Sequence, residues 1–299
     1  MNFHALLDHF TIKVATLSKF RFFNNSIESP SFAEHLAAIE FDMPIIQGEG
    51  YYEIPAKSLV GPLDPAFHIA QWRGSEFPIL IFHHGNNERP FDYGATSKNT
   101  FKNIFLVKKE EISANLIAIR APYHRSLKDY TREMTHLSNF LAMLAVSTSL
   151  VDSLVQLAHE RLISPIVVGG ISLGGWVTNL HRAYFGSADA YVPMLAGAAL
   201  EDVFLESAYQ SLSGETAREN PEIVKQALNF ELQFLQAPEA NVFPLLARHD
   251  QIIRLERQRL SYAKHPLTIV NKGHVTTALA SERLREHVLK RLINPRDQF

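Results

Sequence analysis

Residues 165–176 read PIVVGGISLGGW, and this stretch decides the fold. A short run of β-branched residues ends at Gly169 and Gly170, and a segment with helical periodicity begins near Trp176. Ser172 lies between them at the centre of the pattern G-x-S-x-G. At a strand-to-helix turn this pattern is typical of a nucleophile elbow, which lifts a serine hydroxyl above a sheet. The alternative is an ordinary glycine-rich turn whose serine caps the helix.

Six further short runs rich in Ile, Val and Phe accompany this one. They are FHIAQW (67–72), PILIFH (78–83), NLIAIR (115–120), AYVPML (190–195), VFPLLA (242–247) and LTIV (267–270). Most of them do not alternate between apolar and polar residues, which indicates strands that are buried on both faces of a parallel sheet. Helical segments lie between most of the runs. This alternation predicts an α/β protein with a mostly parallel, doubly wound sheet and helices on both faces.

The length and composition favour one domain. The chain has 299 residues, of which 46% are hydrophobic, and this suffices for one large α/β core, with two small domains as the alternative. We expect a single domain over residues 1–299. Residues 1–40 are expected to be a helical N-terminal extension, with a capping box at Ser31 and Glu34. Residues 198–240 are expected to form a helical cap inserted between two strands.

Charge and residue usage exclude several classes of protein. The 29 Lys+Arg and 31 Asp+Glu give a net charge of −2 without a basic stripe, so no nucleic-acid partner is expected. The chain has no cysteine, which excludes disulfides and thiolate chemistry and fits a cytoplasmic location. No zinc motif stands out, and we expect neither a metal nor a cofactor.

No part of the sequence is expected to span a membrane. The first residues do not form a secretory signal, because charged residues interrupt the apolar ones. No window holds 18 uncharged apolar residues. The stretch from Leu137 to Leu157 contains Ser, Asn, Thr and Gln, and it is interpreted as a buried helix. The sequence leaves the oligomeric state open, a homo-oligomer included.

Polar residues that could serve Ser172 follow two later strands. Residues 242–247 are followed by Arg248, His249 and Asp250, and His274 follows residues 267–270 after Asn271, Lys272 and Gly273. A serine hydroxyl is a weak nucleophile without a general base, and a histidine oriented by a carboxylate is such a base. Because the carboxyl ends of parallel strands lie at one edge of a sheet, these side chains are expected to meet there. The sequence therefore predicts Ser172, Asp250 and His274 as catalytic residues.

Each partner of Ser172 has an alternative role and a rival. Asp250 could simply cap a helix near Gln251, and His274 could be an ordinary core histidine. The rival acids are Glu201 and Asp202, and the rival histidines are His124 and His249.

The loop HHGNN at residues 83–87 follows the strand 78–83 and precedes the elbow. Such a loop supplies one backbone N–H to an oxyanion hole, and the residue after the nucleophile supplies the other. The expected donors are the N–H groups of Asn86 and Leu173, with Asn87 as the other candidate. The alternative is a plain glycine turn with solvated asparagines.

The chain resembles the α/β-hydrolase superfamily over residues 67–299. The resemblance rests on HHGN at 83–86, GISLG at 170–174, Asp250 after a strand and KGH at 272–274. It implies an eight-stranded sheet and an acyl-serine intermediate. The loop lacks the HGGG of many esterases, because Asn86 and Asn87 replace the last two glycines, which argues against bulky tertiary-alcohol esters. Residues 1–40 have no counterpart.

The resemblance implies a serine hydrolase, carboxylesterase-like, that cleaves a carboxylic ester of a small-molecule acyl substrate, with thioesters and amides as alternatives. Two other functions stay open at this point. The same serine could pass its acyl group to an acceptor other than water, or the scaffold could bind a ligand without catalysis.

Overall fold

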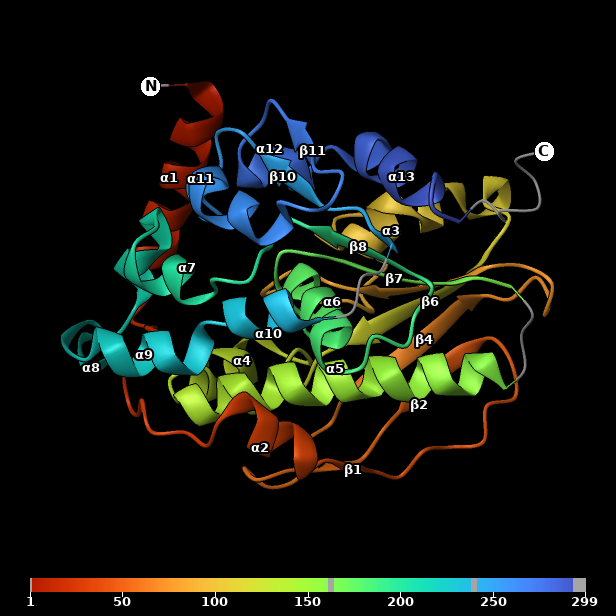
Figure 1. Cartoon of the computed structure of the whole chain (residues 1–299), viewed down its shortest axis with the longest axis horizontal. Coiled ribbons are helices and arrows are strands. Elements are labelled where there is room, and N and C mark those ends of the chain that lie inside the picture. Colours follow the sequence, from red (N-terminus) through yellow and green to blue (C-terminus); the bar gives the residue numbers. More distant parts are fainter. Residues whose placement is uncertain (1, 161–163, 238–240, 293–299) are drawn as a thin grey trace.

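The computed structural model describes residues 2–160, 164–237 and 241–292. Its centre is a nine-stranded sheet (Figure 1). The strands are β2 (Gly50–Glu53), β4 (Ala66–Gln71), β5 (Ile79–His83), β6 (Asn115–Arg120), β7 (Ile166–Ile171), β8 (Ala190–Met194), β9 (Asn241–Val242), β10 (Leu245–Ala247) and β11 (Thr268–Val270). Eight of them follow the order β11-β10-β8-β7-β5-β6-β4-β2, and β9 pairs with β8. The expected core of eight strands is present, with β9 in addition.

The sheet is mostly parallel, as the unalternating sequence runs predicted. The strands from β11 to β6 are parallel to their neighbours, whereas β4 and β2 are antiparallel. Every residue of β5, β6, β7 and β8 is buried. The single strand predicted at 242–247 is wrong in one respect, because Phe243 and Pro244 separate β9 from β10. Proline has no N–H to give to a strand ladder, which explains the break.

Helices cover both faces of the sheet (Figure 1). On one face lie α5 (Leu137–His159) and α6 (Leu173–Tyr184), with α2 (Phe32–Ala37) packed on α5. On the other face α3 (Thr100–Ile104) packs against α13 (Ser281–Leu289). By length and composition α5 could cross a membrane, but 72% of its most apolar window is buried inside the fold. It is the buried core helix that the sequence predicted.

The N-terminal residues are tied to the core rather than extended from it. The helix α1 (Phe3–Thr16) packs against α12 (His274–Ala278) and against the short helix η2 (Ala208–Leu212), beside which it appears in Figure 1. The helix α2 begins with the expected capping box, in which Ser31 N–H donates to Glu34 Oε2 at 2.8 Å. Residues 1–40 therefore bring α1 to the carboxyl edge of the sheet.

The described residues of the segment 198–240 form short helices joined by loops. They are α7 (Glu201–Leu205), η2, α8 (Glu215–Glu219), α9 (Pro221–Leu228) and α10 (Glu231–Gln236). Residues 238–240 lie outside the described part of the chain. The aromatic side chains of Phe204, Phe230 and Phe234 are buried, so most of the apolar surface of this insertion packs onto the core.

Candidate active site

Ser172 occupies a strained turn between β7 and α6. Its backbone has φ 53° and ψ −114°, a region that residues with a side chain rarely adopt. Two hydrogen bonds hold the turn: Ser172 N–H donates to Met194 O at 2.8 Å, and Trp176 N–H donates to Ser172 O at 3.1 Å. The serine side chain is partly exposed. This is the geometry of a nucleophile elbow.

Three of the four glycines around Ser172 are required by close packing, namely Gly170, Gly174 and Gly175, whose added Cβ would lie 2.6 Å from Met194 O. A Cβ at Gly170 would overlap the carbonyl group of Gly174, and a Cβ at Gly174 would overlap the carbonyl oxygen of His83. A Cβ at Gly169 would lie 3.5 Å from its nearest neighbour, which is an ordinary contact. The start of α6 therefore rests directly on the end of β5, next to the expected oxyanion loop.

Gly174→Ala is expected to lower the free energy of unfolding by about 3 kcal/mol or more, because the backbone of β5 cannot move away. Gly169→Ala is the matched control and should change stability by less than about 1 kcal/mol. Thermal unfolding followed by circular dichroism measures both. Equal stability of the two variants would contradict the packing described for the elbow.

Asp250 and His274 are in direct contact at the same carboxyl edge. Asp250 follows β10, His274 begins α12 after β11, and Asp250 Oδ2 lies 2.8 Å from His274 Nδ1. The Asp250 side chain is fully buried, and that of His274 is 12% exposed. Asp250 Oδ1 accepts the N–H groups of Ile252 at 2.8 Å and Ile253 at 2.7 Å. These bonds fix the carboxylate so that its other oxygen holds the imidazole.

The pairing sets the protonation of the imidazole. A carboxylate can only accept a hydrogen bond, so the neutral His274 ring carries its proton on Nδ1 and has a lone pair on Nε2. Burial alone would lower the pKa of His274, but the negative charges of Asp250 and Asp8 outweigh it and raise the pKa above its ordinary value of 6.5. This is the state required of a general base oriented by an acid.

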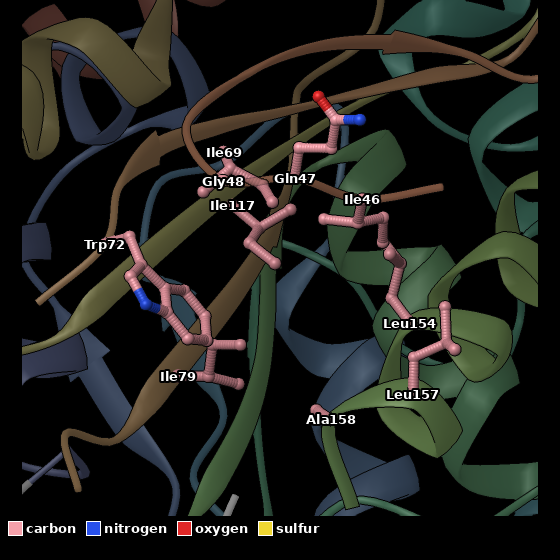
Figure 2. Close-up of a pocket in the computed structure, with 10 residues that line it drawn as sticks. All are labelled: Ile46, Gln47, Gly48, Ile69, Trp72, Ile79, Ile117, Leu154, Leu157 and Ala158. Atoms are coloured by element: carbon pink, nitrogen blue, oxygen red, sulfur yellow. The ribbon is translucent and has the colours of Figure 1, made fainter. Parts of the chain in front are cut away.

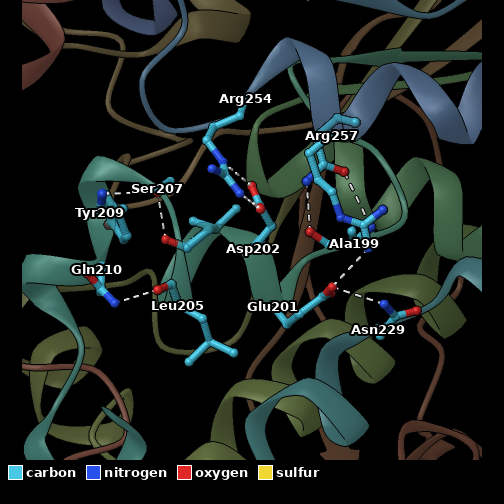
Figure 3. A network of polar contacts seen from close by, with 12 residues as sticks. Ala199, Glu201, Asp202, Leu205, Ser207, Tyr209, Gln210, Asn229, Arg254 and Arg257 are labelled. Atoms are coloured by element: carbon cyan, nitrogen blue, oxygen red, sulfur yellow. Dashed lines mark hydrogen bonds and ion pairs between the residues drawn. The ribbon is translucent and has the colours of Figure 1, made fainter. Parts of the chain in front are cut away.

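The rival acids, Asp202 and Glu201, form ion pairs with arginine side chains (Figure 3). Arg254 Nε lies 3.1 Å from Asp202 Oδ2, and Arg257 lies 3.2 Å from Glu201 Oε1. Glu201 also accepts a 2.9 Å hydrogen bond from Asn229. Both carboxylates thus belong to ion pairs that connect α7 with α11 (Leu255–Gln258) and the residue before it. In the described part of the chain, the side-chain bonds of these two carboxylates go to Arg254, Arg257 and Asn229.

Among the described residues, neither rival histidine is paired with a carboxylate. His124 Nδ1 lies 3.0 Å from Pro122 O, and His249 Nε2 lies 2.8 Å from Asn271 Oδ1. Among the residues that the structure describes, no group of three His, Asp or Glu side chains is placed to hold a metal ion.

The expected oxyanion loop is oriented by His84. Its Nε2 accepts the Ala121 N–H at 3.1 Å, so its proton lies on Nδ1, which donates to Gly85 O at 2.6 Å. Burial holds the pKa of His84 well below 6.5, so the ring stays neutral. In a trans peptide the N–H points opposite to the C=O, so the Asn86 N–H is directed away from His84.

Neither expected oxyanion donor has an acceptor elsewhere. Within residues 2–160, 164–237 and 241–292, no protein group accepts the N–H of Asn86 or of Leu173. Leu173 is the first residue of α6, where N–H groups have no partner inside the helix. Asn87, the other candidate, has φ 58° and an exposed side chain.

Aromatic side chains enclose the side chain of Asn86. Tyr130 donates its hydroxyl to Asn86 Oδ1 at 2.5 Å, and Asn86 Nδ2 donates to the Tyr209 hydroxyl at 3.2 Å. The Phe22 ring packs on Tyr209 with 5.7 Å between centroids and on Phe204 with 5.1 Å. No local sequence pattern predicts this aromatic cluster of Phe22, Tyr130, Phe204 and Tyr209. Its members come from the N-terminal extension, α4 (Leu127–Glu133), α7 and η2.

A cavity of about 230 Å³ lies apart from these residues (Figure 2). Its apolar lining includes Trp72, Ile79 at the start of β5, and Leu154 near the end of α5. Ser172, Asp250 and His274 all follow carboxyl ends of strands, whereas Ile79 is at an amino end. The cavity therefore does not belong to the candidate active site.

Comparisons with known proteins bear on the fold. No protein-family model matches the sequence, and no curated protein matches it. Acetyl xylan esterase 1 from Thermoanaerobacterium sp. JW/SL YS485 superposes with a TM-score of 0.54 at 13% identity, over 92% of this chain and 98% of that one. The acetyl xylan esterase from Paenibacillus sp. R4 has the same TM-score at 12% identity, over 96% and 94%.

A peptidase shows the same likeness over part of its length. The acylaminoacyl peptidase from Pyrococcus horikoshii superposes with a TM-score of 0.54 at 16% identity. The match covers 83% of this chain and 41% of the peptidase, so this chain spans about two fifths of that protein. Identities this low show a shared fold and not a shared substrate. The chain has the α/β-hydrolase fold.

Proposed function

We propose that the protein is a serine hydrolase that cleaves a carboxylic ester through an acyl-serine intermediate. The observation that carries the proposal is the buried Asp250–His274 hydrogen bond at the edge of the sheet where the strained turn presents Ser172. A protein that used this scaffold only for binding would need neither a strained serine nor an oriented imidazole.

Each residue has a defined role in the proposed reaction. Ser172 Oγ attacks the ester carbonyl carbon while His274 Nε2 takes its proton. Asp250 stabilises the imidazolium that forms. The N–H groups of Leu173 and Asn86 bind the oxyanion of the tetrahedral intermediate, which then expels the alcohol as His274 protonates it. Water, deprotonated by His274, releases the acid from Ser172 in the second half of the reaction.

We further propose that the acyl group is short. Tyr130 and Tyr209 hydrogen-bond the Asn86 side chain and Phe22 packs on Tyr209, so we expect these rings to limit the length of an acyl chain next to the proposed oxyanion. The likeness in fold to two acetyl xylan esterases over nearly their whole length agrees with a small acyl group.

A panel of 4-nitrophenyl esters tests the proposed acyl length. Acetate is expected to exceed octanoate in kcat/KM by about 100-fold or more, because a pocket that excludes added methylenes discriminates strongly. Tyr209→Ala should raise the octanoate-to-acetate ratio at least about 10-fold, whereas Tyr209→Phe keeps the ring and should leave the ratio unchanged. A wild-type preference for octanoate would contradict the short-acyl proposal and leave the hydrolase proposal standing.

A further inference from the structure

The inner face of α1 carries a buried carboxylate, that of Asp8, whose side chain touches both loops of the Asp250–His274 pair. Asp8 is 0% exposed. Its Oδ2 accepts the backbone N–H of Gln251 at 3.2 Å and that of His274 at 2.8 Å, and its Oδ1 accepts the N–H of Val275 at 3.0 Å. A single side chain from residue 8 thus joins the residue after Asp250 to His274 itself.

The charge of Asp8 is held by these N–H groups alone. Among the described residues, no Lys, Arg or His forms an ion pair with it. A buried carboxylate is costly unless hydrogen bonds replace its lost water, and three N–H donors supply them. A residue that served only to attach α1 could be apolar, like Ala5 and Ile12 on the same buried face. The carboxylate therefore calls for an explanation beyond packing.

Gly273 is the counterpart of Asp8 on the histidine loop. A Cβ at Gly273 would lie 2.7 Å from Asp8 Oδ2 and 2.8 Å from His4 O. Any side chain at position 273 would push α1 away from the loop. The glycine of the KGH motif is thus required by the approach of α1. The ring of His4 also stacks on His249, next to Asp250, with 6.1 Å between centroids.

We propose that Asp8 is a positioning residue for the His274 base: its carboxylate clamps the loop after β10 to the start of α12 and so sets the Asp250–His274 hydrogen bond. The catalytic role of this clamp rests on the proposed function, whereas its geometry does not. Because Asp8 Oδ2 bridges Gln251 and His274, a change in its position changes the distance between the two loops. Its negative charge also lies close enough to favour the imidazolium that forms when Ser172 is deprotonated.

The test uses Asp8→Asn, with Asp42→Asn at an exposed position as the matched control. In Asp8→Asn, kcat is expected to fall about 10- to 100-fold with little change in KM, since the base is misplaced while the ester site is intact. In the wild type the acidic limb of the pH profile of kcat/KM is expected above pH 6.5, because the pKa of His274 is raised. It should move to lower pH by about half a unit or more, because loss of a negative charge lowers the pKa of His274.

A second readout does not depend on hydrolysis. The titration of His274 is followed by NMR of its ring carbon-bound protons, assigned by their loss in His274→Gln. Other charged or titratable groups on these segments include Asp250 and His249 on the loop after β10, His4 on α1 and Lys272 on the loop before His274. His4→Ala in the wild-type background separates the charge of that ring from the effect of Asp8.

Gly273→Ala tests the same contact from the other side. It should lower kcat and shift the His274 titration in the same direction as Asp8→Asn, and the double variant should be little worse than either single one. If one of these two variants does not fold, the other variant alone tests the clamp. A folded Asp8→Asn or Gly273→Ala with a wild-type kcat and an unmoved His274 titration would overturn the clamp, even if it were less stable. If Ser172→Ala kept full activity while Asp8→Asn still moved the titration, the proposed function would fail and the clamp would stand.

Discussion

Ser172→Ala is expected to lower kcat for ester hydrolysis by about 10⁴-fold or more while the protein stays folded. Without the hydroxyl no acyl-enzyme forms, and only binding and the oxyanion donors remain to assist water. Alanine has the same backbone restriction as serine, so the strained φ of 53° is neither relieved nor worsened. The measurement is kcat on the best ester of the panel, together with circular dichroism to check folding.

Labelling by a fluorophosphonate gives the same result without knowledge of the substrate. Intact mass should show one adduct on the wild type and none on Ser172→Ala. Ser211→Ala is the matched control, because Ser211 is an exposed serine on η2 whose hydroxyl donates to Ala208 O, and this variant should still take one adduct. No adduct on the folded wild type would favour a ligand-binding protein on this scaffold. An adduct retained by Ser172→Ala would place the reactive group elsewhere.

The placement of Ser172, Asp250 and His274 could be predicted because parallel strands end at one edge of the sheet. Each residue follows an apolar run within a few positions, and the parallel strands β7, β10 and β11 end on the same side. This prediction did not require knowledge of the spatial order of the strands in the sheet. Local signals of strand and turn were enough to bring three residues from distant parts of the sequence to one edge.

The supporting residues could not be predicted in the same way. Asp8 lies on a helix that has no counterpart in the family pattern, and its partners are the backbone N–H groups of Gln251, His274 and Val275. Because almost every residue type has a backbone N–H group, the identity of these partners does not show that they bind a carboxylate. One sign in the sequence is Gly273 of the KGH motif, a glycine that the approach of α1 requires.

The aromatic cluster around Asn86 could not be predicted from the sequence for the same reason. Tyr130 and Tyr209 come from two helices that are separated by the whole elbow region, and each touches one end of a single amide group. Burial raises the pKa of Tyr209 to about 12, so its hydroxyl stays protonated and can still take part in hydrogen bonds at neutral pH. An asparagine in place of the glycine of other oxyanion loops thus gains two partners that glycine could not have. The substitution that set this sequence apart from the HGGG pattern is explained by the side chains that hold it.

Asp250→Asn and Asp202→Asn are expected to have opposite effects, and this pair decides which acid serves His274. At neutral pH Asp250→Asn should lower kcat by about 10³- to 10⁴-fold, because an amide does not fix the proton of His274 on Nδ1 or stabilise its cation. Asp202→Asn should keep kcat within a few-fold but lower the free energy of unfolding by about 1–2 kcal/mol, because it breaks the pair with the partly exposed Arg254.

Kinetics on the ester panel and thermal unfolding of both variants separate the two roles. The Asp250 turn is also a structural element, since Oδ1 accepts the N–H groups of Ile252 and Ile253, and an asparagine oxygen can still accept them. A folded Asp250→Asn therefore loses the charge next to His274 while keeping the turn. If that variant retained wild-type kcat and Asp202→Asn were inactive, the acid would be Asp202, and the 2.8 Å contact between Asp250 and His274 would be structural only. If both variants were inactive but folded, the prediction that Asp202 serves stability and not catalysis would be wrong.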